Sequence, residues 1–417
     1  MKLEITQLDI MSLSLRPHQL AWADEAYKIL GEHGLVYNTS LERTGKTLSS
    51  IRLVELTSRQ SCLVLTKKAA IPDWLTAIED YPVPKTFQVI NYESAHKIEP
   101  DSFDIVILDE AHHGLGKYPK PSKTFLKIAK LVYGLPLIYL SATPHAETFS
   151  QLYYQLRLSP WSPFAEYKNF YEWHKEFGIE EIVYLAGRAM KMYNVTQEDR
   201  IKPIFDTISL GVTRKEIGFK HEAQDIKHFI RLDKSSQELS DTISKDRVAE
   251  VQGYEVLAET VGSMLQKVYQ IEGGTLKIEV GMKNETTKDY VSVSLGNTEK
   301  IDYIKDKWGD TDGMVIMYNY KQEEILLRQH FQNALIRQAD RFAEGVSFKH
   351  KEHLIIYSMS WRTSKHIQRK NRQADMERET PINVHFLLVD GGISEKIYDA
   401  VVEKNINFNG RSYMEMT

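Results

Sequence analysis

Short apolar runs alternate with amphipathic stretches along the first part of the chain. Runs of this length, bounded by polar or turn-forming residues, predict buried strands, and stretches with a helical period predict helices packed against them. The apolar runs occupy residues 34–37, 61–66, 87–92, 104–108 and 135–140. The amphipathic stretches occupy residues 19–31, 48–56 and 70–81. Strands that alternate with helices in this way predict an α/β fold with a parallel sheet.

A second set of strand-like runs lies near the end of the chain. These runs occupy residues 313–320, 354–357 and 382–384, and a helix-like segment follows at 391–400. The domain formed by these runs is expected to be compact, without a full strand–helix unit between Tyr320 and Gly345.

The stretch between the two sets has a different pattern. Residues 232–270 carry apolar positions at helical spacing, and two alternating stretches, 275–280 and 290–295, flank a polar turn. Alternation across a polar turn predicts a β-hairpin. We therefore expect three parts: a parallel-sheet domain at 1–146, a mainly helical insertion with a hairpin at 147–295, and a second parallel-sheet domain at 296–417.

Composition narrows the class of protein. The 417 residues are 42% hydrophobic and 26% charged, which is ordinary for a soluble globular protein, and the net charge of −4 confines any nucleic-acid binding to local basic patches. The single cysteine, Cys62, excludes an internal disulfide framework and a cysteine-rich zinc site, and we expect it to be buried. No apolar run reaches the length of a membrane span, and no signal-peptide core is seen, so a cytoplasmic location is expected.

The residues Ser40-Leu41-Glu42-Arg43-Thr44-Gly45-Lys46-Thr47 join the first apolar run to a helix-like segment. Backbone N–H groups at a helix start bind phosphate, and the helix dipole favours its charge. In the usual phosphate loop the lysine reaches the β- and γ-phosphates and the hydroxyl ligates Mg²⁺. We therefore expect an ATP site in which Lys46 and Thr47 take these roles and Arg43, Thr44 and Gly45 line the loop. The loop departs from the usual pattern at its first position, where Ser40 replaces glycine.

Two adjacent carboxylates, Asp109 and Glu110, follow the apolar run at 104–108. The first can hold Mg²⁺, and the second can orient or deprotonate the water that attacks the γ-phosphate. An acidic strand–helix junction is the alternative interpretation. His112 is interpreted as a coupling residue. Ser141 and Thr143, after the run at 135–140, could hydrogen-bond the carboxylate loop and sense hydrolysis.

These three motifs, in this order and each at the end of an apolar run, resemble helicase superfamily 2, in particular its Swi/Snf-type, DEAH-box-containing branch. The resemblance implies two tandem RecA-like domains, with ATP and Mg²⁺ bound through the first. Residues 15–19, Leu-Arg-Pro-His-Gln, look like the adenine-recognising entry of this branch, which implies that Arg16 and Gln19 contact the nucleotide. An amide such as that of Gln19 can read the adenine edge bidentately.

The resemblance continues in the second half, which keeps the order of the family motifs. Residues 343–348 look like a Gly-Val-Gly-Leu-type loop containing Gly345, and residues 368–372 resemble the Gln-x3-Arg motif, which assigns Gln368 and Arg372 to the nucleotide. Asp375 occupies the position of the family's second arginine. Either Arg372 serves alone, or Arg369 or Arg378 substitutes, or the ATPase is weak.

The resemblance also implies a nucleic-acid surface. Its candidate residues are Lys67, Asn91, Tyr92, Arg362, Lys365 and His366. Duplex, forked or branched DNA is favoured over RNA as the partner, and a monomer is expected, in the host cytoplasm if the protein is phage-encoded. The basic pair Arg214-Lys215 could also touch DNA. The aromatic residues at 153–173 could pack a core or stack bases, and the hairpin could be decoration or a strand-separating pin.

The function expected from these motifs is that of a DNA-dependent ATPase that translocates on, remodels or unwinds DNA. A first alternative is a catalytically weak, ATP-gated clamp at forks or junctions, which Ser40 and Asp375 favour. A second alternative is a P-loop kinase, which explains Lys46 but leaves the carboxylate pair and the Gln-x3-Arg motif without a role.

Overall fold

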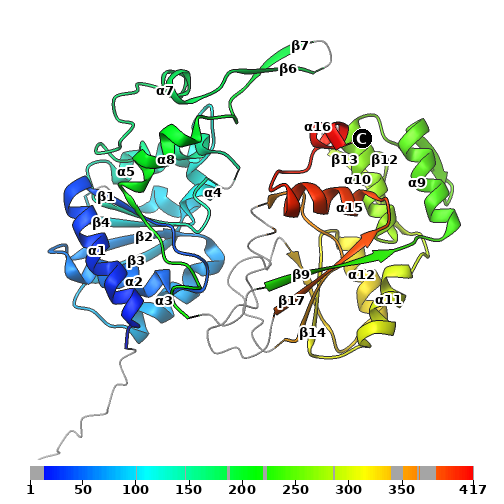
Figure 1. The fold of residues 1–417 in the computed structure, drawn as a ribbon, viewed down its shortest axis with the longest axis horizontal. Helices are drawn as coiled ribbons and strands as arrows, with labels where there is room; N and C mark the ends of the chain where they lie inside the picture. The colour runs from blue at the N-terminus through cyan, green and yellow to red at the C-terminus, as the bar shows by residue number, and fades with distance from the viewer. Residues whose placement is uncertain are drawn as a thin grey trace, which may run out of the picture. The chain divides into compact units, whose positions relative to one another are not determined.

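The structure is a computed structural model that describes residues 14–99, 101–145, 147–185, 188–218, 223–284, 287–339, 351–363, 366 and 382–416. It divides the chain into two compact units, unit 1 (Met1–Gly218) and unit 2 (Phe219–Thr417). Each has its own parallel sheet covered by helices (Figure 1). Among the described residues no helix is both long and apolar enough to cross a membrane.

Unit 1 is built on a six-stranded sheet in the order β3-β2-β4-β5-β1-β8, in which every pair is parallel. Its strands are β1 (Leu35–Asn38), β2 (Ser61–Thr66), β3 (Thr86–Asn91), β4 (Ile105–Asp109), β5 (Leu137–Leu140) and β8 (Ser209–Leu210). The five strands expected from the apolar runs are confirmed, and the sixth comes from far along the sequence.

Helices cover both faces of this sheet because successive residues of a buried strand point to opposite sides. Val36, Val64 and Ile107 pack in one core with α1 (Pro17–His33), α2 (Lys46–Leu56) and α3 (Ile71–Asp80). Tyr37 and Leu108 pack in a second core on the other face. The helices on that side are α4 (Ala111–Leu115), α5 (Lys123–Val132), α6 (Leu152–Leu156), α7 (Phe170–Phe177) and α8 (Glu198–Asp206).

The aromatic stretch after β5 belongs mainly to this second core. Tyr153, Phe164, Phe170 and Trp173 are almost fully buried there, which confirms core packing as their role. A two-stranded hairpin, β6 (Glu181–Leu185) and β7 (Arg188–Met192), extends from the same region (Figure 1).

Unit 2 is built on a five-stranded sheet in the order β15-β14-β16-β17-β9, again with every pair parallel. Its strands are β9 (Ala223–Ile230), β14 (Met314–Tyr318), β15 (Leu335–Gln338), β16 (His353–Ile356) and β17 (Ile382–Val389). One face packs against α11 (Glu299–Trp308) and α12 (Lys321–His330), and the other against α10 (Val261–Glu272) and α15 (Ile393–Tyr398). The α/β fold class with two tandem RecA-like domains is thus confirmed.

The division of the chain differs from the three parts expected at 1–146, 147–295 and 296–417. The strand β8 pairs with β1 in unit 1, and β9 pairs with β17 in unit 2, so the middle stretch is shared between the units. A sheet edge offers unpaired backbone groups to any strand that reaches it, whatever its place in the sequence.

Two local expectations in unit 2 are also wrong. The stretch 232–270 is two helices, α9 (Lys234–Asp246) and α10, separated by the hairpin of β10 (Val248–Val251) and β11 (Tyr254–Leu257), whose turn has positive φ at Gln252 and Gly253. A full helix–strand unit, α12 followed by β15, does lie between residues 320 and 345. The expected hairpin is confirmed as β12 (Thr275–Asn284) and β13 (Thr287–Ser294). A further helix of unit 2 is α16 (Gly410–Met416).

Three histidines from neighbouring strands of unit 2 form a buried chain of hydrogen bonds. His228 Nε2 lies 3.0 Å from His385 Nδ1, and His385 Nε2 lies 3.3 Å from His353 Nδ1. Lys307 Nζ lies 3.3 Å from His228 Nδ1. Burial, with the neighbouring cationic groups, lowers the pKa of His228 to about 4 and that of His385 to about 3. The folded unit therefore holds these rings neutral.

Acidification should therefore destabilise unit 2. An unfolded histidine titrates near pH 6.5. Below this pH the unfolded chain binds more protons than the folded chain does. The free energy of unfolding should therefore fall as the pH drops from about 6.5 towards 4. Chemical denaturation between pH 4 and 8 measures this. In His385→Asn the fall should be smaller, and an equal fall in both proteins would contradict the role of the cluster.

Candidate nucleotide-binding site

The loop between β1 and α2 has the backbone geometry of a phosphate loop. Gly45 precedes the helix with φ of 85° and ψ of 33°, a left-handed conformation that side chains rarely adopt. A Cβ atom at Gly45 would lie 2.0 Å from Nε2 of Gln19, so a side chain here would displace the Gln19 amide from the loop. The backbone conformation therefore favours glycine, and the N–H groups at the start of α2 remain open to an anion.

Ser40 fits the first position of the loop without strain. Its φ is not positive, so the backbone does not require glycine there. The residue is 3% exposed, its N–H donates to Asn38 Oδ1 at 3.0 Å, and its Oγ accepts from the N–H of Val212 at 3.1 Å. The serine that replaces glycine therefore gains one hydrogen bond that glycine could not make, from Oγ to the N–H of Val212.

Lys46 begins α2 and turns back over the loop. Its Nζ donates to the main-chain oxygens of Ser40 at 2.9 Å and Leu41 at 3.1 Å. The ammonium group thus lies inside the curve of the loop, where it can exchange these carbonyl oxygens for phosphate oxygens. Thr47 follows it in the first turn of the helix, as expected.

The N-terminal helix α1 contacts the same loop. His18 Nε2 lies 2.9 Å from the oxygen of Thr44, and Gln19 Nε2 donates to the oxygen of Gly45 at 3.4 Å. Gln19 Oε1 accepts from the N–H of Arg16 at 2.8 Å. The structure therefore brings Gln19 to the phosphate loop and joins the main chain of Arg16 to Gln19, whereas contact of either residue with a nucleotide stays a prediction.

The carboxylate Asp109 ends β4 and is held by two neighbours. Thr66 Oγ1 and Trp74 Nε1 both donate to its Oδ2, at 2.7 and 2.9 Å. The hydroxyl of Tyr92 donates to the main-chain oxygen of Asp109 at 2.7 Å. Tyr92 is only 6% exposed, and its hydroxyl group stabilises the carboxylate loop from the protein interior. This differs from the expectation that Tyr92 contacts DNA at the surface. Burial, with Asp109 nearby, raises the pKa of this hydroxyl well above its usual value.

Glu110, His112 and Ser141 come together beside Asp109. Glu110 has a positive φ of 52°, and its Oε2 lies 3.5 Å from Nδ1 of His112. The same nitrogen lies 2.8 Å from Ser141 Oγ, which accepts from the N–H of Thr143 at 3.0 Å. Of the three residues expected to couple hydrolysis to movement, His112 therefore contacts the second carboxylate directly, and Ser141 and Thr143 connect to it through His112.

A buried layer under this network was not predicted from the sequence. The rings of Tyr37 and Tyr139 stack with centroids 5.1 Å apart, and Tyr37 donates to Gln155 Oε1 at 2.7 Å. Gln155 Nε2 donates to the oxygen of Pro144 at 2.9 Å. Gln155 thus ties the strand before the phosphate loop to the loop after Ser141. No motif identifies it, because these contacts join residues far apart in the chain.

Arg214 is a second residue whose place the sequence did not show. Its Nε donates to the main-chain oxygen of Glu42 at 3.1 Å, and its guanidinium pairs with Glu42 Oε2 at 3.2 Å. The side chain is 14% exposed. It is therefore engaged with the phosphate loop rather than presented to DNA as expected.

The residues present fit a magnesium ion bound together with a nucleotide. In the part of the chain that the structure describes, no group of three or more acidic, histidine or cysteine side chains is arranged to hold a metal. Mg²⁺ is usually held by one or two protein ligands plus phosphate oxygens and water, so a preformed cage is not required. Asp109 keeps Oδ1 outside the two hydrogen bonds to Oδ2, and Thr47 offers a hydroxyl.

Buried ionisable side chains form hydrogen bonds with the loops at the strand ends of unit 2. Lys300 donates to the oxygen of Tyr357 at 3.1 Å, and Glu323 Oε2 accepts from Ser358 Oγ at 2.7 Å. Glu272 accepts from the N–H groups of residues 393 and 394 at the start of α15. Burial raises the pKa of both carboxyls and lowers that of Lys300. The opposite charges and hydrogen bonds offset the cost of burial and fix these loops.

The remaining candidates lie outside this network. Lys67 follows β2, and Asn91 ends β3, where its Nδ2 donates to Glu93 Oε2 at 2.7 Å. Arg362 is exposed, whereas His366 is 8% exposed and lies against Phe386. The candidates outside the described residues are Gly345, Lys365, Gln368 and Arg372, together with Arg369, Asp375 and Arg378.

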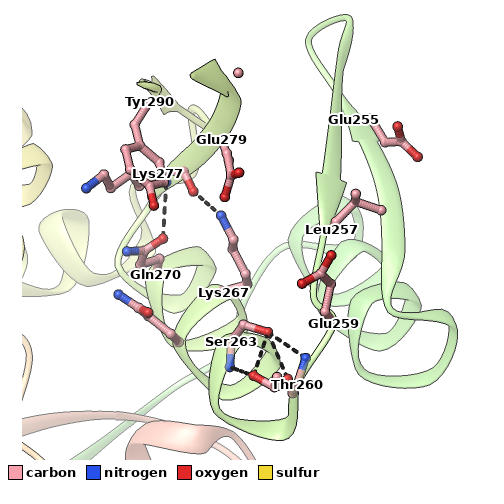
Figure 2. Close-up of a pocket in the computed structure, with 12 residues that line it drawn as sticks. Glu255, Leu257, Glu259, Thr260, Ser263, Lys267, Gln270, Lys277, Glu279 and Tyr290 are labelled. Atoms are coloured by element: carbon pink, nitrogen blue, oxygen red, sulfur yellow. Dashed lines mark hydrogen bonds between the residues drawn. The ribbon is translucent and has the colours of Figure 1, made fainter. Parts of the chain in front are cut away.

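Unit 2 also contains a cavity of about 450 Å³ away from its strand ends. It lies between the two hairpins and α10, and Figure 2 shows Lys267 beside Glu259 and Glu279 in it. Lys277 sits 4.0 Å from the ring centroid of Tyr290. The hairpin β12–β13 therefore forms a wall of this cavity, whose lining contains both acidic and basic side chains.

Comparison with known proteins gives one kind of match. No protein-family model matches the chain, and no curated protein matches it. Among the solved structures that match is the Sulfolobus solfataricus SWI2/SNF2 ATPase core in complex with dsDNA, with 14% identity and a TM-score of 0.41. The match covers 97% of this chain and 96% of that chain.

Substituting the loop glycine should unfold the site locally. Gly45→Ala forces a side chain into a left-handed conformation and against Gln19, and we expect it to lower the free energy of unfolding by about 1–3 kcal/mol. The matched control is Gly31→Ala, because no atom lies within 4 Å of a Cβ at this helical position. The control should be neutral or stabilising, since alanine is the better helix former. Thermal unfolding measures both, and equal midpoints would contradict the geometry.

Proposed function

We propose that this protein is a DNA-dependent ATPase that couples ATP hydrolysis to translocation on, or remodelling of, DNA. The observation that supports it best is the convergence of three groups at one edge of the unit 1 sheet: the Lys46 loop, the Asp109–Glu110 pair, and the Ser141–His112 contact. Phosphate binding alone would fit many proteins. A carboxylate pair linked by hydrogen bonds to a neighbouring strand end fits nucleotide hydrolysis coupled to movement.

The roles follow from the chemistry of each group. Lys46 and the N–H groups of the loop would bind the phosphates, and Glu110 would orient or deprotonate the attacking water. Thr47 and Asp109 would hold Mg²⁺, which neutralises phosphate charge when bound. Gln19 would contact the adenine. Arg372 is the proposed catalytic arginine, with Gly345 and Gln368 as further nucleotide contacts.

Coupling would pass through the contacts of His112. Hydrolysis changes the hydrogen-bonding needs of Glu110, which lies 3.5 Å from the His112 ring. His112 can transmit that change to Ser141 and Thr143. Gln155 and Tyr37 then connect this loop back to the strand that carries the phosphate loop. A small rearrangement at the carboxylate could in this way bias the position of whole elements.

DNA is proposed as the partner because of the motif resemblance to Swi/Snf-type enzymes. Binding would rest mainly on phosphate contacts and would therefore be independent of sequence and weakened by salt. The proposed contacts are Lys67, Asn91, Arg362 and Lys365. His366 is not kept among them because, like Tyr92, it is buried. Duplex, forked or branched DNA is the proposed substrate.

Steady-state ATP hydrolysis should be stimulated by DNA. The measurement compares single-stranded, duplex, forked and four-way DNA with protein alone. Lys46→Ala and Glu110→Gln should each lower the stimulated rate by about 10² or more, because they remove a phosphate ligand and the group acting on water. Nucleotide binding should survive in Glu110→Gln. ATP-dependent DNA binding without stimulated turnover would instead favour the clamp, and turnover unaffected by Glu110→Gln would contradict the site.

Removing the Ser141 hydroxyl should separate hydrolysis from its control by DNA. In Ser141→Ala the contacts to His112 and to the N–H of Thr143 are lost, while Lys46 and both carboxylates remain. We expect ATP affinity close to that of the intact protein, with a several-fold smaller stimulation by DNA, since one or two hydrogen bonds are lost. Stimulation equal to that of the intact protein would exclude the coupling role.

A further inference from the structure

The segment that leaves unit 1 runs alongside the phosphate loop. We call residues 208–214 the strap. Its main chain accepts hydrogen bonds from β1 and the loop in steps of two residues: Tyr37 N–H to Ile208 at 2.7 Å, Thr39 N–H to Leu210 at 3.0 Å, and Leu41 N–H to Val212 at 3.1 Å. The parallel pairing of β1 with β8 therefore continues past the end of the strand and into the loop.

Side-chain hydrogen bonds hold the strap at three points, Leu210, Val212 and Arg214. Trp22 of α1 donates from Nε1 to the oxygen of Leu210 at 3.0 Å, and Ser40 Oγ accepts from the N–H of Val212. The guanidinium group of Arg214 donates to both the main-chain oxygen and the carboxylate of Glu42. The pair is largely buried, with side-chain exposures of 14% for Arg214 and 23% for Glu42. Such a two-point contact fixes both a peptide plane and a side chain.

The contact between Arg214 and Glu42 lies next to the part of the loop with a strained backbone. Glu42 lies beside Arg43, whose φ of 66° is a strained conformation for a residue with a side chain. The loop oxygens of Ser40 and Leu41 hold the ammonium group of Lys46. A strained residue favours relaxation of the loop to other conformations, so contacts from outside the loop help to keep its N–H groups in the arrangement that binds a phosphate.

We propose that Arg214 is a positioning residue for the phosphate loop, and that through it the strap links the state of the loop to the chain segment leading into unit 2. This inference rests on the proposed function, because it assigns a role in nucleotide binding. Arg214, at the end of the strap, lies only a few residues before Gly218, the last residue of unit 1. Nucleotide binding that moves Lys46 and the loop towards the phosphates therefore also moves the strap, because the two are joined by hydrogen bonds.

Binding of a fluorescent ATP analogue to Arg214→Gln tests the positioning role. We expect affinity about tenfold weaker, the factor that 1.4 kcal/mol represents. Because the groups acting on water are untouched, KM for ATP should rise while kcat at saturating ATP changes little. Arg214→Lys should restore part of the affinity, since lysine keeps the charge but loses the fork.

The chain offers a matched control. Arg200 binds the main-chain oxygen of Glu176 at 2.8 Å and pairs with its carboxylate, the same two-point contact away from the phosphate loop. Arg200→Gln should bind and hydrolyse ATP like the intact protein. Equal losses in the two variants, or none in Arg214→Gln, would overturn the positioning role.

Hydrogen exchange tests the link itself. In the intact protein the analogue should change the protection of peptides covering residues 208–218, and in Arg214→Gln at saturating analogue this change should be lost. An unchanged response in the variant would overturn the link. Intact protein that binds the analogue but never hydrolyses ATP would refute the proposed function alone, whereas absence of nucleotide binding would overturn both.

Discussion

The parallel register of β1, β5 and β4 is the constraint on which the rest of unit 1 depends. Asn38 at the end of β1 pairs with Leu140 of β5, and Leu140 in turn pairs with Asp109 of β4. The three strands therefore end at the same level of the sheet. The phosphate loop, Ser141 and Glu110 all leave the sheet from that level. Because β5 lies between the other two strands, Ser141 stands between the phosphate loop and the carboxylates.

Buried hydrogen bonds turn this shared edge into a connected site. Thr66 and Trp74 fix Asp109 from the neighbouring strand and helix, and Gln155 joins the strand before the phosphate loop to the loop after Ser141. Such networks are stiff when every member is paired. Unit 2 uses a comparable device at its own strand ends, where Lys300 lies among buried carboxyls. In both units, buried polar residues therefore hold the loops at the strand ends in place.

The phosphate loop is the part of this edge that depends most on its surroundings. It contains a strained Arg43 and a glycine in a left-handed conformation, and it carries a serine at its first position. Helix α1 supports it through His18 and Gln19, and the segment after β8 supports its other side. The loop is therefore held between an early and a late segment of unit 1, which a description of the motif alone would miss.

The sequence by itself determined the five strands from β1 to β5, the helices that accompany them, and the motifs that follow these strands. These features are local: apolar period, turn residues and the Gly-Lys-Thr and Asp-Glu pairs are read within a few positions. It therefore placed Lys46 correctly at a helix start and Asp109 and Ser141 correctly at strand ends. Only the tertiary structure decided that β8 and β9 complete the two sheets, that Tyr92 is buried under Asp109, and that Arg214 binds Glu42. Those outcomes depend on partners distant in the chain, and local patterns carry no information about which distant residues will meet.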